Sequence, residues 1–394
     1  MDRRDRRARL SRDPAGRRRL ATLGAVALLA AAAGAVAGSD AGEGGPSRGD
    51  TAQAGGMRLP LRGDAAQAGA ARLPLRVQVG QLIVSSFGGA RLPEYLRRRL
   101  RRRQTAGVIL FRRNVSSRPG LRRLSRRIQG ATGRGALVMT DQEGGPVRNL
   151  VFAGPVPSQP RQGSPRRVGR LAAGAARQLR AAGVNVALAP VADLAAGHAM
   201  RFRAFAGASG AVAARVGASV QGWRRGRVGA TAKHFPGFGA AAVNSDLRPV
   251  TIRLSRRRLE RHLRPFRSAI AGGVPLIMAA HALYPAYSLR RIASQSRELL
   301  THLLRDRLGY EGVVITDSIE AKAVVRRSSV PLAAERSIAA GADLVLTTGS
   351  ASWKLVFPRL LRRARRSPAF RTRVRESAAR VLRLKRRLGL RAPG

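Results

Sequence analysis

Short apolar runs alternate with helical stretches along the chain from Val77 onward. Most of the runs lack the alternation of apolar and polar residues that a strand with one exposed face shows. This pattern is typical of a parallel sheet, because helices cover both of its faces. The predicted strands are residues 81–87, 107–111, 136–140, 184–189, 229–233, 276–280, 312–316 and 344–347.

Helical periodicity fills most of the intervals between these runs. Helices are predicted at residues 94–103, 168–182, 211–225, 255–271, 296–308 and 332–340. Gly183, Gly309 and Gly341 stand where helix C-caps are expected. Eight strand and helix units in about 310 residues predict an α/β fold, a (β/α)8 TIM barrel forming a single catalytic domain. An open doubly wound sheet stays the alternative, because counting strands does not separate the two architectures.

The N-terminal segment has the pattern of an export signal. Residues 1–19 are densely basic, and residues 20–37 are uncharged and apolar, ending in Ala35-Val36-Ala37. A basic region, an apolar region and small residues at the end are typical of a secretory signal peptide. Arg17-Arg18-Arg19 also fits a twin-Arg signal, and an uncleaved membrane anchor is the alternative for residues 1–37. We therefore expect export to the extracellular space or the cell envelope.

Residues 38–76 are rich in Gly and Ala and contain an imperfect duplication. The segment AQAGGMRLPLR at Ala52 recurs as AQAGAARLPLR at Ala66. This composition buries little apolar surface, so it predicts a flexible linker. The barrel domain is then expected over residues 77–390.

Basic residues greatly outnumber acidic ones in the 394-residue chain. There are 75 Lys and Arg against 21 Asp and Glu, which gives a formal net charge of +54. This excess predicts non-specific attraction to anionic envelope polymers or to a membrane surface, unless it is a general preference for Arg on solvated helix faces. Aromatic residues make up 4% of the chain and offer few stacking platforms, so no specific nucleic acid partner is expected. The absence of Cys excludes disulfides, thiolate nucleophiles and Cys-based zinc sites.

Ionisable side chains follow five of the eight predicted strands. They are Asp141, Asp193, Lys233 with His234, His281 and Asp317. In a parallel barrel the carboxyl ends of the strands meet at one mouth, where catalytic groups gather. Any one of these side chains could instead be structural, as an Asp that caps the following helix is. Their repetition favours a functional site at the mouth.

Several strings around these positions carry a family resemblance. They include DQEGGPV at Asp141, RAF at Arg203, KHFPGFG at Lys233 and GVVITDS at Gly312. With them, the chain from Val77 to about Leu388 resembles the N-terminal barrel domain of glycoside hydrolase family 3. Within that family it is similar to the single-domain bacterial β-N-acetylglucosaminidases, also called β-N-acetylhexosaminidases.

The resemblance implies a retaining glycosidase that removes terminal β-linked N-acetylhexosamine or a related sugar through a glycosyl-enzyme. Asp317 matches the nucleophile. Four residues match positions that hold the sugar, namely Asp141, Arg203, Lys233 and His234. The resemblance implies no cofactor and a carbohydrate substrate, such as a cell-wall fragment or an oligosaccharide.

One catalytic position departs from the family pattern. The similar glucosaminidases carry a His acid/base on the loop after KHFPG, with an Asp two residues before it. Here the loop reads NSD, so Asn244 stands in the Asp position and Asp246 in the His position. We expect Asp246 to act as the acid/base, provided that burial and the nearby Asp317 raise its pKa. The alternative is a catalytically weak or inactive carbohydrate-binding barrel of the cell envelope.

A metal-dependent hydrolase with Asp141, His234, His281 and Asp317 as ligands is a further alternative. No strand carries the paired His-x-His that such barrel sites use. The sequence therefore predicts no metal site.

Overall fold

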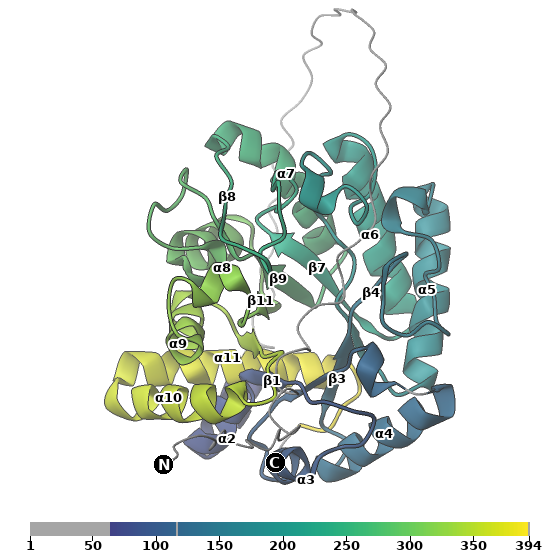
Figure 1. Ribbon diagram of the computed structural model, residues 1–394. Coiled ribbons are helices and arrows are strands. Elements are labelled where there is room, and N and C mark those ends of the chain that lie inside the picture. Colours follow the sequence, from purple (N-terminus) through teal and green to yellow (C-terminus); the bar gives the residue numbers. More distant parts are fainter. Residues whose placement is uncertain (1–63, 116, 393–394) are drawn as a thin grey trace, which may run out of the picture. The chain divides into compact units, whose positions relative to one another are not determined.

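Eight parallel strands close into a barrel in the computed structural model, which describes residues 64–115 and 117–392 (Figure 1). The strands are β1 (Ile83–Ser85), β2 (Gly107–Ile109), β3 (Leu137–Thr140), β6 (Val186–Ala187), β7 (Gly229–Phe235), β9 (Leu276–Ala279), β11 (Val313–Ser318) and β12 (Leu344–Leu346). They neighbour one another in sequence order, and β1 pairs with β12 through Ile83 opposite Val345. This last pairing closes the sheet, so the (β/α)8 barrel is confirmed and the open doubly wound sheet is excluded.

Helices connect the strands on the outside of the barrel. They are α3 (Glu94–Arg101), α4 (Arg118–Ala131), α5 (Pro165–Ala181), α6 (Ser209–Arg225), α7 (Arg256–Ala271), the π-helix η6 (Glu298–Arg307) and α9 (Val330–Ala340). The sequence pattern predicted all of these except α4. Helix α4 is capped by Ser117, whose side chain accepts a hydrogen bond from the Gly120 N–H, and it buries Leu121, Leu124 and Ile128. This spacing is helical, but Gly120 and Gly130 inside the segment weaken the signal.

Two small sheets and several short helices lie in the loops. Two small sheets pair β4 (Gln142–Gly144) with β5 (Val147–Arg148) and β8 (Val250–Thr251) with β10 (Ala282–Leu283). The short helices are η2 (Arg112–Asn114), η3 (Gln159–Arg161), η4 (His198–Met200), η5 (Ala293–Gln295) and α8 (Lys322–Val325). These loops carry most of the polar side chains described below.

The barrel interior is filled by every second residue of the strands. On β9, Leu276 and Met278 belong to the interior cluster, whereas Ile277 packs in the layer between strands and helices. On β11, Val313 and Ile315 face inward in the same way. Side chains of a strand alternate between its two faces, so the inward row of β11 continues to residue 317.

Two C-terminal helices that the sequence pattern did not predict complete the fold. They are α10 (Ser352–Arg366) and α11 (Pro368–Arg387). Val381 and Leu384 of α11 join the interior cluster of the barrel, and Lys385 donates a hydrogen bond of 2.6 Å to Gln81, which lies just before β1. Helix α11 therefore closes the amino-terminal end of the barrel and leaves the carboxyl end as the mouth.

The predicted linker was drawn too far along the chain. Residues 64–71 form α1 (Asp64–Ala71), which packs against α11, and α2 (Leu75–Gly80) follows directly. Ala70 and Leu73 are buried. The compositional argument averaged over the segment, whereas a few apolar residues suffice to dock a short helix on an existing surface. The first copy of the duplication and the predicted signal lie outside the described residues.

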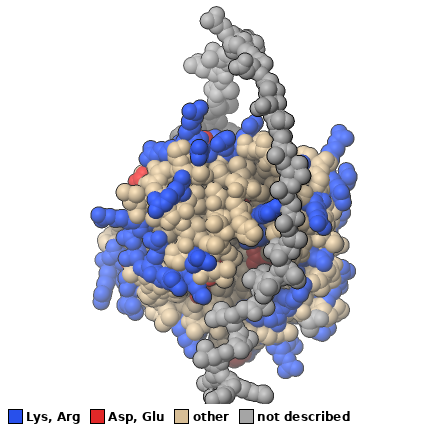
Figure 2. All heavy atoms as spheres, turned by 45° about the horizontal axis from the view of Figure 1, so that its top comes forward, with Lys and Arg blue, Asp and Glu red and all other residues tan. Residues whose placement is uncertain are grey.

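Basic side chains far outnumber acidic ones on the visible surface (Figure 2). Figure 2 shows Lys and Arg spread around one face of the molecule, with few Asp and Glu among them. In residues 64–115 and 117–392, no helix is both long enough and apolar enough to cross a bilayer.

Candidate active site

Three of the predicted site residues lie on inward rows at the carboxyl ends of strands. Asp141 directly follows β3, in line with the inward-facing Leu137 and Met139, and Lys233 lies toward the end of β7. Asp317 lies inside β11, two residues after the inward-facing Ile315, and its Oδ1 accepts the Ser318 N–H at 2.7 Å. Because α8 begins only at Lys322, Asp317 is not a helix cap, and its side chain is free for another role.

A buried ion-pair network joins three of the predicted sugar-binding residues through Glu143 of β4. Lys233 Nζ lies 2.7 Å from both Asp141 Oδ1 and Glu143 Oε1. Arg203 donates two hydrogen bonds to Glu143, one of 2.9 Å from Nε to Oε2 and one of 2.7 Å from Nη2 to Oε1. Such a bidentate pair fixes the guanidinium plane as well as its position. The network therefore holds Asp141, Arg203 and Lys233 in one arrangement.

Glu143 and Lys233 stay charged although they are buried. Burial alone would raise the pKa of Glu143, but Arg203 and Lys233 lower it to about 2. Burial alone would lower the pKa of Lys233, but Asp141 and Glu143 raise it on balance. Removing one partner of such a buried network leaves an uncompensated charge and costs about 3–5 kcal/mol.

His234 is held beside Asp317 by Asp193, which lies in the loop after β6. His234 Nδ1 lies 2.7 Å from Asp193 Oδ2, and the backbone N–H groups of His234 and Phe238 donate to the same carboxylate. The Phe238 ring packs edge-on against the imidazole. With Nδ1–H donated to Asp193, the other ring nitrogen, Nε2, faces Asp317 Oδ2 at 3.9 Å.

The surroundings of Asp317 favour its ionised form. Burial by itself would raise the pKa of this carboxyl, but nearby groups, led by His234, lower it below its usual range. His281 lies close by, fully buried, with Nδ1 2.8 Å from Ser294 Oγ. Burial lowers the pKa of His281 and so favours its uncharged form.

Asp246 lies on the loop after β7, in a local turn with Asn244. Asn244 Oδ1 accepts the Asp246 N–H at 3.0 Å, and Asn244 Nδ2 donates to Asp246 Oδ2 at 3.3 Å. Backbone hydrogen bonds from α8 reach the carbonyls of Ser245 and Asp246. The loop that carries Asp246 is thereby tied to the segment that follows Asp317.

Asp246 and Asp317 influence each other's ionisation. The Asp246 side chain reaches solvent, yet the protein around it desolvates the carboxylate, and this effect together with the charge of Asp317 raises its pKa to about 6. Arg203 and His234 act on the same carboxylate in the opposite direction. The mouth therefore holds one carboxyl with a lowered pKa and one with a raised pKa, the combination that acid/base chemistry needs.

Glu143 and Asp193 support the site by holding other side chains, a role that the sequence did not predict for either residue. Glu143 lies two residues after Asp141 in the DQEGG string, so the period of a strand already placed both on one face. Asp193 was noted only as a polar strand end. Neither signal distinguishes a residue that holds other side chains from one that faces solvent.

Two further observations concern Asn149 and the alternative of a metal site. Asn149 donates hydrogen bonds from its backbone N–H and its Nδ2 to the Asp141 carbonyl, each 3.3 Å long. In the part of the chain that the structure describes, no three His, Asp or Glu side chains are arranged to hold a metal ion. Asp141, one of the four ligands of the metal alternative, is instead paired with Lys233.

Comparison with known sequences finds relatives over most of the chain. The family model described as "Glycosyl hydrolase family 3 N terminal domain" matches residues 74–384. An "Uncharacterized secreted glycosyl hydrolase" of Arthroderma benhamiae is 32% identical over 336 residues, 79% of this chain and 93% of the relative. A "Beta-hexosaminidase" of Xanthomonas campestris pv. campestris is 33% identical over 282 residues, 67% of this chain and 83% of the relative.

Solved structures share the fold. A family 3 β-N-acetylglucosaminidase from a Paenibacillus species superposes with a TM-score of 0.76 at 32% identity, covering 82% of this chain and 64% of that one. A β-N-acetylhexosaminidase from Beutenbergia cavernae superposes with a TM-score of 0.74 at 28% identity, covering 79% of this chain and 98% of that one.

Proposed function

Because this chain belongs to glycosyl hydrolase family 3 and is a glycoside hydrolase, we propose that it removes terminal β-linked N-acetylhexosamine from a carbohydrate with retention of configuration. The names of the relatives supply the sugar class. One observation carries the mechanism: the pKa of Asp246 is raised to about 6 while that of the neighbouring Asp317 is lowered. Retaining glycosidases need such a pair of an acid and a nucleophile.

In the first step Asp317 attacks the anomeric carbon. A carboxylate oxygen forms a bond to this carbon as the glycosidic bond breaks, and the electron pair of that bond goes to the leaving oxygen. Asp246, in its protonated form, delivers a proton to this oxygen. The products are a glycosyl-enzyme on Asp317 and the released alcohol.

In the second step water releases the sugar. Asp246, now ionised, takes a proton from the water as its oxygen attacks the anomeric carbon, and Asp317 leaves as a carboxylate. Asp246 is again protonated, which resets the enzyme. This double displacement requires the two carboxyl groups to be about 5–5.5 Å apart when the sugar is bound.

The buried network and His234 are proposed to hold the sugar. Asp141 offers carboxylate oxygens, and Arg203 and Lys233 offer charged donors, so together they can engage several hydroxyl groups. Because Glu143 and Asp193 fix the donors before the substrate arrives, little side-chain freedom remains to be lost on binding.

A comparison of substrates tests the activity. The purified protein should hydrolyse a chromogenic β-N-acetylglucosaminide faster than the matching β-glucoside, and Asp317→Asn should reduce kcat by about 10³-fold or more. Asp306→Asn serves as the matched control, because Asp306 is an exposed Asp on η6. Turnover of neither substrate, or equal activity of the two Asp variants, would refute the proposal. Sugar binding without any product would instead favour the alternative of a non-catalytic carbohydrate-binding barrel.

Export is proposed from the sequence of residues 1–37, and the description of the Arthroderma relative as secreted agrees with it. Fractionation of cells that express the full chain should recover the protein outside the cytoplasm. Replacing four apolar residues of the segment 20–37 by Asp should trap it in the cytoplasm. Recovery of both proteins in the same fraction would contradict export.

A further inference from the structure

A cavity lies at the amino-terminal end of the barrel, away from the mouth. It has a volume of about 350 Å³. Its wall includes Gly229, which begins β7, and Pro275, which precedes β9. His234 and Asp317 lie toward the opposite ends of their strands. A ligand in this cavity would therefore not occupy the proposed sugar site.

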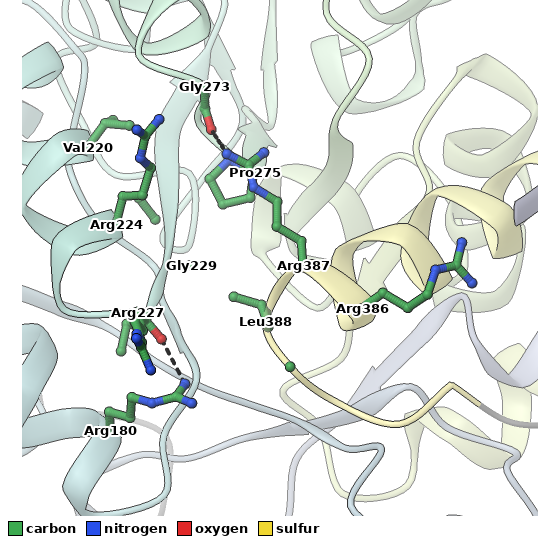
Figure 3. A pocket seen from close by; sticks show the side chains of 13 residues that line it. Arg180, Val220, Arg224, Arg227, Gly229, Gly273, Pro275, Arg386, Arg387 and Leu388 are labelled. Atoms are coloured by element: carbon green, nitrogen blue, oxygen red, sulfur yellow. Dashed lines mark hydrogen bonds between the residues drawn. The ribbon is translucent and has the colours of Figure 1, made fainter. Parts of the chain in front are cut away.

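The lining of this cavity is strongly basic. Five arginines contribute to it, and no Asp or Glu does; they are Arg180, Arg224, Arg227, Arg386 and Arg387 (Figure 3). They come from α5, from α6 and the turn after it, and from α11. Helices far apart in the sequence thus bring formal positive charges to one place without a compensating carboxylate.

Backbone carbonyls hold two of these guanidinium groups in place. Arg180 Nη1 donates to the Arg227 carbonyl at 3.0 Å, and Arg387 Nη2 donates to the Gly273 carbonyl at 2.8 Å. Arg224 and the Arg227 side chain form no ion pair or hydrogen bond with the residues that the structure describes. Their donors are therefore available to a ligand.

Two guanidinium groups approach Gly273. A Cβ atom added to Gly273 would lie 3.3 Å from Arg387 Nη2 and 4.0 Å from Arg224 Nη1. Arg386, in contrast, extends away from the other four arginines in Figure 3. The charges of Arg224 and Arg387 are thus brought close together, although like charges repel. An anion bound between the two groups would attract both of them and offset their mutual repulsion.

The ends of the surrounding helices do not cancel this charge. Helices α5, α6, α7 and α11 end near the cavity, and a helix C-terminus carries about half a negative charge. Arg180 and Arg387 already donate to two of the carbonyls in this region. Four such ends supply about two negative charges against the five formal positive charges of the lining arginines, so the lining keeps a net positive charge.

We propose that this cavity binds a small anion that carries two phosphate groups, as in pyrophosphate or a diphosphate ester. The planar fork of Arg matches phosphate oxygens, and the volume lies within the range of small-molecule sites. The net charge of +54 attracts any anion weakly to any basic surface. The cavity differs from that background because the guanidinium groups of Arg224 and Arg387 approach each other near Gly273, and because carbonyls fix those of Arg180 and Arg387.

Calorimetry with inorganic pyrophosphate tests the assignment on the full chain. The double variant Arg224→Gln/Arg227→Gln removes two lining charges that hold no protein partner, so folding should be preserved. The control Arg177→Gln/Arg225→Gln removes the same charge from α5 and α6, at exposed positions outside the lining. Circular dichroism of all three proteins checks the fold.

We expect the lining variant to lose at least tenfold in affinity for pyrophosphate and the control less than twofold. Inorganic phosphate should bind the unmodified protein at least tenfold more weakly than pyrophosphate. Equal losses in the two double variants would show that only the general charge attracts the anion, and would overturn the proposal. Equal affinities for phosphate and pyrophosphate would overturn the diphosphate assignment. Because none of these measurements uses the glycosidase activity, their outcome is independent of the proposed function.

Discussion

Replacement of Asp246 by Ala should produce a loss of activity that depends on the leaving group. An alcohol of high pKa needs a proton as it departs, whereas a nitrophenolate does not. For a substrate with a poor leaving group, removal of a general acid is expected to lower kcat/KM by about 10²- to 10⁴-fold. For a nitrophenyl glycoside the first step should be far less affected, because the leaving group needs no proton.

The raised pKa of Asp246 determines how strongly kcat/KM should depend on pH. With a pKa of about 6, roughly 9% of Asp246 is protonated at pH 7, whereas at the ordinary value of 3.8 only about 0.06% would be. The local environment thus raises the population of the acid form roughly 150-fold at this pH. For the unmodified enzyme, kcat/KM should fall about tenfold per pH unit above pH 6, since this parameter reports the first step. In the Asp246→Ala variant, kcat/KM should not show this fall above pH 6.

The assay combines both substrates with added azide. Azide needs no general base to attack the glycosyl-enzyme, so it should speed the second step of the Asp246→Ala enzyme on the nitrophenyl substrate and yield a β-glycosyl azide. Leu247→Ala is the control, because Leu247 is the next residue of the loop and is 53% exposed. An equal loss on both substrates, no response to azide and an unchanged alkaline limb would refute the role of Asp246.

Three further predictions concern groups that are buried. Glu143→Gln removes the negative centre between two buried cations and should lower the free energy of unfolding by about 3–5 kcal/mol in urea denaturation. As a control, Glu94→Gln removes one partner of an exposed ion pair and should leave the urea midpoint unchanged. Equal shifts of the midpoint in the two variants would show that the buried network adds no more stability than a surface pair. Asp193→Asn weakens the charged hydrogen bond to His234 and should lower kcat/KM about 10- to 100-fold. It should also lower the melting temperature, because the amide NH2 faces buried donors that the carboxylate accepted; an unaltered kcat/KM would count against the positioning. Burial lowers the pKa of Lys385 from 10.5 to about 7. Between these two pH values, the unfolded chain therefore binds more protons at this residue than the folded chain does. Stability should therefore rise by up to about 1.4 kcal/mol per pH unit between pH 7.5 and 9.5, and an unchanged slope in Lys385→Met would refute this origin.

The sequence was most informative where the signal is local. The apolar run at residues 312–316 predicted the strand β11, because a strand covered on both faces must be apolar throughout. The same run ended on Asp317, which placed this residue at the carboxyl end of the strand, where catalytic groups gather in a barrel. Eight such runs predicted the barrel, which the pairing of β1 with β12 confirmed.

The elements that were missed depend on a surface that other parts of the chain provide. Helix α11 buries Val381 and Leu384 against the open end of the barrel, and α1 packs against α11 in turn. The composition of residues 64–76 gave no sign of this, since a short helix gains its stability from what it docks on. For the same reason the cavity with Arg224 and Arg387 could not be read from a sequence that is rich in Arg throughout.

The amino-acid sequence by itself determined the barrel and the residue types available at its mouth, because periodicity and strand ends are properties of neighbouring residues. Only the tertiary structure decided their charge states. Glu143 stays ionised because two cations surround it, and the pKa of Asp246 rises because the fold desolvates it near Asp317. The electrostatic free energy of a group depends on the distances to other charges and on the exclusion of water, and both are set by residues far away along the chain.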